Sequence, residues 1–208
     1  MSSVNFRLLL VTDRHQLHGR PLSTVLSQAI MAGVPAIQLR ERDLPTRELL
    51  SLAQEVHALI APRAIPLILN DRVDLVLALN LDGVHLRADS LPVSAVRRLI
   101  GPDRLIGIST HSVEEVRRAN HAGADYVIFG PIFDTPSKRS FGPPLGLDAL
   151  ADACRESTIP VFAIGGITSE RVREVRRVRA HGVAVIGALL TRDDIGASAR
   201  EFSDALQT

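Results

Sequence analysis

The sequence predicts an α/β fold of the (β/α)8 class, a TIM barrel formed by a single domain over residues 1–208. Short runs rich in Val, Ile and Leu alternate with longer amphipathic stretches, as parallel strands alternate with the helices that cover them. Eight such runs fit into 208 residues, which suits a compact barrel of eight βα units. Four of the runs also follow a similar glycine-containing phrase, which indicates a repeated unit.

The expected strands are all short. They comprise residues 7–12, 36–40, 66–70, 83–86, 105–109, 126–130, 160–164 and 182–186. The repeated phrases are AGVPAIQ from Ala32, LDGVHL from Leu81, AGADYVIF from Ala122 and AHGVAVI from Ala180. In each phrase we expect the glycine to end a helix with a positive φ before the chain turns into the strand. An open, doubly wound sheet is the alternative arrangement of the same units.

Composition argues against nucleic acid and membrane partners. The 24 basic and 23 acidic residues leave a net charge of +1, so no overall field attracts either partner, and 3% aromatic residues supply few stacking platforms. The first apolar run ends at Asp13, which is too soon for a signal peptide or a membrane span. A single cysteine, Cys154, fits a reducing compartment. We therefore expect a cytoplasmic protein with small-molecule substrates, and a homo-oligomer stays open.

The second strand ends in the polar sequence QLRER. Gln38 and Arg40 are two residues apart and share a face of the strand, whereas Leu39 points the other way. A guanidinium group at the mouth of a barrel suits the oxygens of a phosphate. The alternative is a structural ion pair of Arg40 with Glu41 or Asp71.

The third strand ends at Asn70, and Asp71 follows it directly. A carboxylate at this rim could hold Mg²⁺, which takes one or two protein carboxylates together with water and substrate phosphate oxygens. The alternative is that Asn70 or Asp71 caps a helix that begins at Val73.

Two histidines end strands, His85 on the fourth and His111 after the fifth, and either could carry a proton near neutral pH. Ser109 lies at the same rim. The nearby Ser112 and Glu115 have the spacing of a capping box at the start of the next helix.

The loop after the sixth strand, residues 130–146, is long and rich in Pro and Gly, and loops of this length usually have a function. Thr135 and Ser137 supply hydroxyl groups there, and Lys138 and Arg139 supply positive charge. A solvated basic turn is the alternative interpretation.

Glycines mark the ends of the last two strands. Gly165 and Gly166 allow backbone N–H groups to approach a ligand, and a helix that continues from Glu170 adds its dipole. Gly187 follows the eighth strand, where barrels commonly complete a phosphate site.

Taken together, these segments resemble the thiamine-phosphate synthase family and its close relatives, the thiazole tautomerases. The resemblance covers essentially the whole chain. It is carried, in order, by QLRER from Gln38, NDRVDLVLA from Asn70, GVHL from Gly83, GISTHSVEE from Gly107, and GADYVIFGPIFDTPSK from Gly123 with AIGGI from Ala163.

The resemblance implies an enzyme that joins a pyrimidine diphosphate to a thiazole phosphate, giving thiamine phosphate and pyrophosphate. It implies catalytic roles for Arg40, Ser109 and Lys138, and Mg²⁺ bound by Asp71. The implied pyrimidine-diphosphate residues are Gln38, Arg40, Arg42, Asn70, Ser109 and Lys138. The implied thiazole-phosphate residues are Thr135, Ser137, Gly165, Gly166, Val185, Ile186 and Gly187.

The chain departs from the family pattern at three places. Arg42 replaces a lysine, Arg87-Ala88 replaces glycine-glutamine, and Ser90 stands where a second metal-binding aspartate is expected, with Asp89 one residue earlier. Asp89 is therefore the candidate for the second metal ligand.

Three other functions stay open. One is a thiazole tautomerase, in which His111 would move the proton without a metal. Another is a non-catalytic barrel that binds thiamine intermediates or a regulatory partner. A further phosphate-binding barrel isomerase is less favoured, because it gives no reason for the ordered QLRER, ND and TPSK segments.

Overall fold

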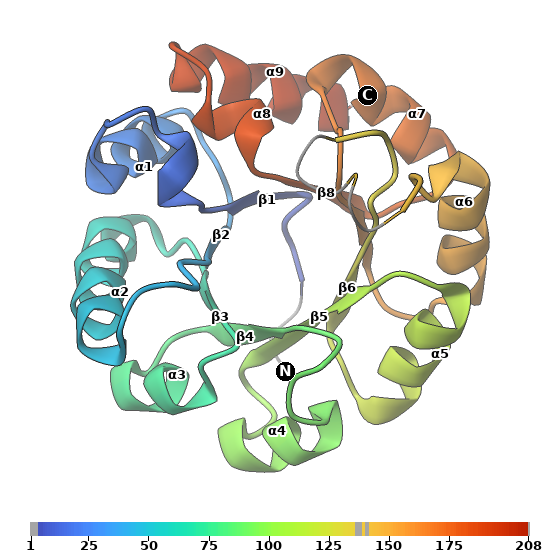
Figure 1. The fold of residues 1–208 in the computed structure, drawn as a ribbon, viewed down its shortest axis with the longest axis horizontal. Coiled ribbons are helices and arrows are strands. Elements are labelled where there is room, and N and C mark those ends of the chain that lie inside the picture. The colour runs from blue at the N-terminus through green and yellow to red at the C-terminus, as the bar shows by residue number, and fades with distance from the viewer. Residues whose placement is uncertain (1–3, 136–138, 140–141, 208) are drawn as a thin grey trace.

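The strands of the chain form a closed parallel barrel surrounded by helices (Figure 1). The structure is a computed structural model that describes residues 4–135, 139 and 142–207. Within these residues, eight strands follow one another around the barrel in sequence order, and β1 pairs with both β2 and β8. The ring is therefore closed, which confirms the barrel and excludes the open sheet.

The expected strands are confirmed to within two residues at each end. They are β1 (Leu8–Val11), β2 (Ile37–Leu39), β3 (Leu67–Asn70), β4 (Gly83–Leu86), β5 (Leu105–Thr110), β6 (Tyr126–Phe129), β7 (Val161–Ala163) and β8 (Gly182–Val185). The α-helices are α1 (Leu22–Met31), α2 (Thr46–Ile60), α3 (Val73–Leu79), α4 (Val93–Ile100), α5 (Val113–Ala122), α6 (Gly146–Glu156), α7 (Val172–Arg177), α8 (Gly187–Leu190) and α9 (Ile195–Gln207). Short 3-10 turns are η1 (Arg14–Gln16), η2 (Ala61–Arg63) and η4 (Ser169–Arg171).

The prediction for the four phrase glycines is correct for two of them and wrong for the other two. Gly33 and Gly123 have positive φ values of 89° and 87° after α1 and α5. Gly83 and Gly182 instead begin β4 and β8 and do not have positive φ. A Cβ atom on Gly83 would lie 2.5 Å from the Leu105 carbonyl oxygen, and one on Gly182 would lie 2.1 Å from that of Arg7. These two glycines are needed because a neighbouring strand passes so close.

Alternate residues of the strands pack into two separate apolar layers. Leu10 and Leu39 belong to the layer between the strands and the helices, whereas Leu9 belongs to the barrel interior. The lower part of the interior is closed by the rings of Phe6, Tyr126 and Phe162, whose centroids lie 5.4–6.2 Å apart. This end of the barrel interior is thus a packed core, and a cavity opens at the opposite end, at the carboxyl-terminal ends of the strands.

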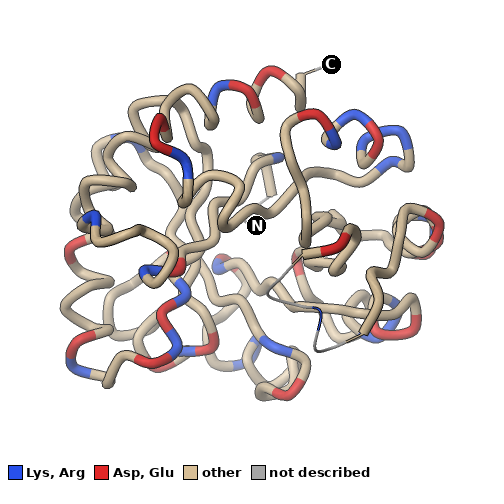
Figure 2. Tube along the Cα trace, turned by 45° about the horizontal axis from the view of Figure 1, so that its top comes forward, with Lys and Arg blue, Asp and Glu red and all other residues tan. Residues whose placement is uncertain are grey.

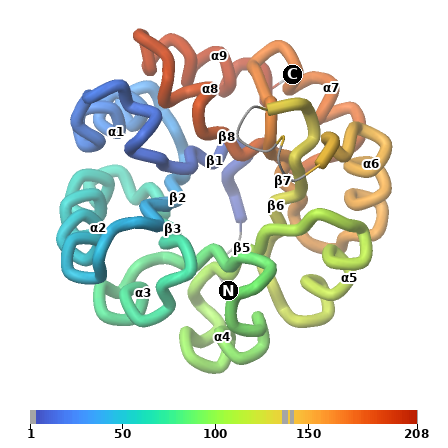
Figure 3. The backbone as a smooth tube through the Cα atoms, viewed as in Figure 1, coloured from blue at the N-terminus to red at the C-terminus, as the bar shows by residue number. Residues whose placement is uncertain are grey.

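The last helix completes the outer layer. Helix α9 packs against α1 and α7, so the last helix of the chain lies beside the first (Figure 3). Basic and acidic residues are interspersed along the outer helices and loops (Figure 2). Among the described residues, no helix has the length and apolar character needed to cross a bilayer.

Candidate functional site

A cavity of about 1000 Å³ opens at the carboxyl-terminal ends of the strands. The segments that follow the strands meet there, so residues far apart in sequence line one space. Every described member of the expected substrate-binding set contributes to the lining. These residues are Gln38, Arg40, Arg42, Asn70, Ser109, Thr135, Gly165, Gly166, Val185, Ile186 and Gly187.

Gln38 on β2 brings an amide group into the buried part of the cavity. Its Nε2 atom donates to Oδ1 of Asn70 at the end of β3, at 3.1 Å. Its Oε1 atom is buried and has no hydrogen-bond partner among the described residues. Since a buried acceptor without a donor is costly, Oε1 is a natural place for a ligand N–H group to bind.

Arg40 follows β2 on the same face as Gln38, as the strand spacing predicts. Its guanidinium makes no ion pair with a described residue, because Glu41 bonds instead to Thr12 at 2.6 Å and to Arg14 at 3.3 Å. Burial, and next the charge of Arg42, lower the pKa of Arg40. The structural ion pair is therefore absent among the described residues, and an anion in the cavity would relieve the repulsion between the arginines.

Asp71 takes a strained position beyond β3, with a φ of 61°. Its carboxylate accepts a short hydrogen bond from the Ser90 hydroxyl and lies 3.6 Å from Nε of Arg87. It does not cap α3, whose N-cap residue is Arg72 and has no side-chain capping bond. Asp71 lines a smaller cavity of about 120 Å³, which shares Arg42, Asn70 and Arg87 with the main one. The capping interpretation is therefore wrong for this helix.

Asp89 turns towards Arg87 rather than towards Asp71. Nε and Nη2 of Arg87 donate to the two carboxylate oxygens of Asp89, both at 2.9 Å. Both carboxylates thus contact one guanidinium group, and Ser90 is the residue that contacts Asp71 from this loop. No group of three or more His, Cys, Asp or Glu side chains in the described part of the chain is arranged to hold a metal. Mg²⁺ can nevertheless bind to one protein carboxylate when phosphate and water complete its shell, and Asp71 fits that role.

His85 is fully buried and bonded at both ring nitrogens. Nδ1 lies 3.2 Å from the Tyr126 hydroxyl and Nε2 lies 2.9 Å from the Ser109 hydroxyl. Burial, with a smaller effect of the charge on Arg40, lowers the pKa of His85 to about 3. The proton-carrier role expected for it is therefore not supported, because the ring is neutral near pH 7. Its hydrogen bond instead holds the Ser109 hydroxyl in position.

His111 differs from His85 because it lines the cavity and, among the described residues, only one of its ring nitrogens has a hydrogen-bond partner. Nδ1 lies 2.6 Å from the carbonyl oxygen of Gly130, which can only accept, so Nδ1 carries the proton and Nε2 is the basic atom. The backbone around it is fixed by the helix cap. Ser112 accepts from the backbone N–H of Glu115, while the Glu115 carboxylate accepts from the N–H of His111 rather than from that of Ser112.

The loop after β6 contributes Thr135 to the cavity lining. Next to it, Asp134 pairs with Arg139 through bonds of 2.5–3.2 Å, so the charge of Arg139 is held by a carboxylate. Ser137 and Lys138, which the sequence places in the site, lie outside the described residues.

The two glycines after β7 allow a close approach of the β6 loop. Gly165 and Gly166 have φ values of 95° and 63°, and a Cβ atom on Gly166 would lie 2.6 Å from the Asp134 carbonyl oxygen. The expected helix begins as the 3-10 turn η4 at Ser169, one residue before Glu170, and α7 follows it. The two glycines therefore line the cavity and also leave room for the loop after β6 to pack against them.

The lining residues that were not identified from the sequence include Gln16, Arg171 and Arg192. A Cβ atom on Gly187 would lie 2.6 Å from Oε1 of Gln16, so this glycine makes room for the glutamine. Arg171 donates to the Gly166 carbonyl oxygen at 2.8 Å, and its guanidinium lies 4.5 Å from the centre of the Phe133 ring. Arg171 could have been found from the sequence, because it is a basic residue in the turn that follows Gly165 and Gly166.

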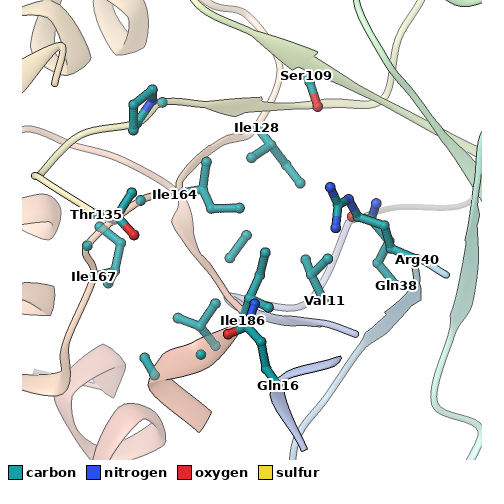
Figure 4. Close-up of a pocket in the computed structure, with 18 of the residues that line it drawn as sticks. Val11, Gln16, Gln38, Arg40, Ser109, Ile128, Thr135, Ile164, Ile167 and Ile186 are labelled. Atoms are coloured by element: carbon teal, nitrogen blue, oxygen red, sulfur yellow. The ribbon is translucent and has the colours of Figure 1, made fainter. Parts of the chain in front are cut away.

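The polar groups lie at opposite sides of the cavity with apolar residues between them (Figure 4). Gln38 and Arg40 lie on one side and Thr135 on the other. The labelled residues between the two sides include Val11, Ile128, Ile164 and Ile186. The cavity can therefore hold two charged groups about an apolar centre.

Comparison with known proteins gives a consistent result. The family described as "Thiamine monophosphate synthase" matches residues 8–189. A "Thiamine-phosphate synthase" of Roseiflexus sp. (strain RS-1) is 44% identical over 191 residues, which cover 92% of this chain and 81% of the relative. The protein of the same name from Clostridium novyi (strain NT) is 39% identical over 201 residues, covering 97% and 98%. The solved structure of a thiamine phosphate pyrophosphorylase from Pyrococcus furiosus superposes with a TM-score of 0.87 at 32% identity, covering 97% and 95%.

Proposed function

The chain belongs to the thiamine monophosphate synthase family, and on this premise we propose that it is a transferase that makes thiamine phosphate. The substrates are 4-amino-2-methyl-5-(diphosphooxymethyl)pyrimidine and thiazole phosphate or its carboxylate, and pyrophosphate is released. The observation that carries the proposal is the main cavity, which has polar groups at both sides of an apolar centre. Such a cavity suits two phosphate esters whose rings must meet.

The pyrimidine diphosphate binds on the β2–β5 side. The buried Oε1 atom of Gln38 accepts a hydrogen bond from the amino group of the pyrimidine, which gives this oxygen its missing partner. Arg40 and Arg42 bind the diphosphate, with Asn70 and Ser109 beside them and Lys138 added from the β6 loop. His85 keeps the Ser109 hydroxyl in position.

The thiazole phosphate binds on the β6–β8 side. Thr135 and Ser137 donate hydroxyl hydrogen bonds to its phosphate. Gly165, Gly166 and Gly187 present backbone rather than side chains there, and Val185 and Ile186 pack against the ring.

The chemical step breaks the C–O bond between the pyrimidine methylene group and the diphosphate, and the bonding electrons leave with the diphosphate. The thiazole nitrogen then donates its electron pair to the resulting cation and forms the new C–N bond. Arg40 and Lys138 stabilise the charge that develops on the leaving group. The apolar residues Ile128 and Ile164 keep water away from the cation.

Magnesium fits this site through Asp71, with Asp89 as the second candidate ligand. When bound with substrate, Mg²⁺ would neutralise part of the diphosphate charge. The substrates are small molecules, and the single cysteine agrees with a reducing, cytoplasmic setting.

The proposal is tested by mixing purified protein with both substrates and Mg²⁺ and measuring thiamine phosphate with and without chelator. We expect product that disappears when the chelator is added. Folded protein that binds thiazole phosphate but makes no product would contradict the synthase activity and favour a non-catalytic binding barrel.

A second candidate function is thiazole tautomerase, because Nε2 of His111 is a basic atom at the cavity. In this reaction His111 removes a proton from the ring of thiazole carboxylate phosphate and returns it at another position. Incubation in D₂O would incorporate deuterium into the thiazole, and His111→Gln would stop the incorporation. Incorporation that continues in the variant would exclude this role.

A further inference from the structure

Arg87 occupies the boundary between the two cavities at the rim. It lines the main cavity and also the smaller cavity that contains Asp71, whereas Asp71 lines only the smaller one. The positive charge that the loop after β4 presents to the main cavity is therefore the guanidinium group of Arg87.

The guanidinium of Arg87 is held in place by carboxylates on one of its edges. Nε and Nη2 donate to Asp89 at 2.9 Å, and Nε lies 3.6 Å from Asp71. The backbone N–H of Arg87 also donates to Oγ of Ser90 at 2.9 Å, and Ser90 in turn bonds to Asp71. A guanidinium group has a second edge, formed by Nη1 and the remaining N–H of Nη2, and this edge can bind an oxygen anion while the first edge stays paired.

Arg87 lines the main cavity together with Arg40 and Arg42. Its charge contributes to lowering the pKa of Arg40, after the larger effects of burial and of Arg42. Its side chain is 44% exposed, so it can turn towards a ligand without disturbing the core. Three arginines therefore surround one part of the cavity, and a diphosphate is the group in the proposed reaction with enough charge to bridge them.

We propose that Arg87 binds the diphosphate group directly, as a resident cation, so that diphosphate binding by this chain does not require free Mg²⁺. The inference rests on the proposed function for the identity of the substrate. It concerns binding of the diphosphate and leaves the metal dependence of the chemical step unchanged.

The test is isothermal titration calorimetry with inorganic pyrophosphate, in buffer with EDTA and in buffer with Mg²⁺. We expect the wild type to bind pyrophosphate in EDTA, and Arg87→Gln to weaken this binding at least about 10-fold, as the loss of a charge-assisted hydrogen bond predicts. Arg98→Gln is the control, because Arg98 is an exposed arginine of α4 outside the cavity lining, and it should bind as the wild type does.

A double variant separates direct binding from simple charge balance. Arg87→Gln leaves Asp89 unpaired, so its negative charge could by itself repel pyrophosphate. Arg87→Gln with Asp89→Asn removes both charges, and we expect binding in EDTA to stay weak. Binding restored to the wild-type level in the double variant would overturn the proposal, as would a wild type that binds pyrophosphate only with Mg²⁺.

The coupling assay distinguishes this result from a failure of the proposed function. Wild-type protein that binds pyrophosphate through Arg87 but makes no thiamine phosphate would refute the synthase activity and retain the anion site. Wild-type protein that makes thiamine phosphate but has equal pyrophosphate affinity in Arg87→Gln would refute the role of Arg87 alone.

Discussion

The Nε2 atom of His85 lies 2.9 Å from the hydroxyl oxygen of Ser109, so a fully buried imidazole ring supports a serine at the rim of the cavity. The other ring nitrogen bonds to Tyr126, which can reach it because Gly107 has no side chain in the path of the tyrosine ring. A neutral histidine thus links the packed interior to the binding site.

The buried state of His85 predicts a pH-dependent stability. Its pKa is about 3 in the folded protein and 6.5 as the ordinary value, so between these pH values the unfolded chain binds a proton that the folded chain does not. Stability should therefore fall as the pH decreases from 6.5 towards 3. Between pH 7 and pH 5 the loss from this group is about 2 kcal/mol. Urea denaturation at both pH values should show a smaller loss for His85→Gln than for the wild type, and equal losses would contradict the prediction.

Replacing Gln38 by leucine should separate substrate binding from stability. Leucine removes the buried, unpartnered Oε1 atom, so the free energy of unfolding should change by no more than about 1 kcal/mol. The same change removes the acceptor for the pyrimidine amino group, so kcat/KM for the pyrimidine diphosphate should fall at least about 10-fold. Steady-state kinetics and thermal unfolding measure the two effects. A large loss of stability with unchanged kinetics would mean that Gln38 is structural.

Replacing Asp71 by asparagine should remove the proposed metal ligand and leave the fold intact. We expect coupling activity to fall about 100-fold or more, because a metal bound at the leaving group contributes several kcal/mol to the barrier. Asp74→Asn is the matched control, because Asp74 pairs with Arg72 on an exposed surface outside the cavity lining and should have little effect on the rate. The family resemblance predicts the same loss for Lys138→Ala. Full activity in Asp71→Asn would exclude the metal role of this carboxylate.

A pair of glycine substitutions should have opposite effects on stability. Gly166→Ala places a Cβ atom 2.6 Å from a backbone oxygen at a φ of 63°, so it should destabilise the protein by about 3 kcal/mol and weaken thiazole phosphate binding. Gly196→Ala in α9 meets the end of the Arg200 side chain at 3.3 Å and the Asp194 carboxylate at 3.4 Å, with no backbone atom in the way, and should stabilise by up to about 1 kcal/mol. Chemical denaturation and titration with thiazole phosphate test both. Equal stability of the two variants would contradict the role assigned to Gly166.

The strand order and many of the polar residues that line the cavity could be predicted from the sequence, because both follow from periodicity. Successive side chains of a strand point to opposite faces, so Gln38 and Arg40 both line the cavity and Leu39 packs against the helices. The rims of parallel strands meet at one end of a barrel, so polar residues after β2, β3 and β5 had to lie together.

Other features depend on contacts between segments, which no local pattern records. Arg87 could pair with either of two carboxylates, Asp89 two residues after it or Asp71 sixteen residues before it. The sequence does not show that the two direct hydrogen bonds go to Asp89. The neutral state of His85 follows from its burial beneath the rim, and Gly83 is required by a backbone oxygen of Leu105. Gln16 was missed because it comes from a short 3-10 turn after β1 rather than from a strand end.

Barrel closure also determines when during synthesis the protein acquires its binding site. Strand β1 pairs with β2 on one edge and with β8 on the other. The first strand to be synthesised therefore keeps one edge unpaired until the last strand has been made. The described residues assigned to the diphosphate side come before residue 110 and those assigned to the thiazole side come after residue 130, and only the complete ring holds the two proposed sides opposite each other. A nascent chain therefore has no closed site for both substrates until β8 has been made.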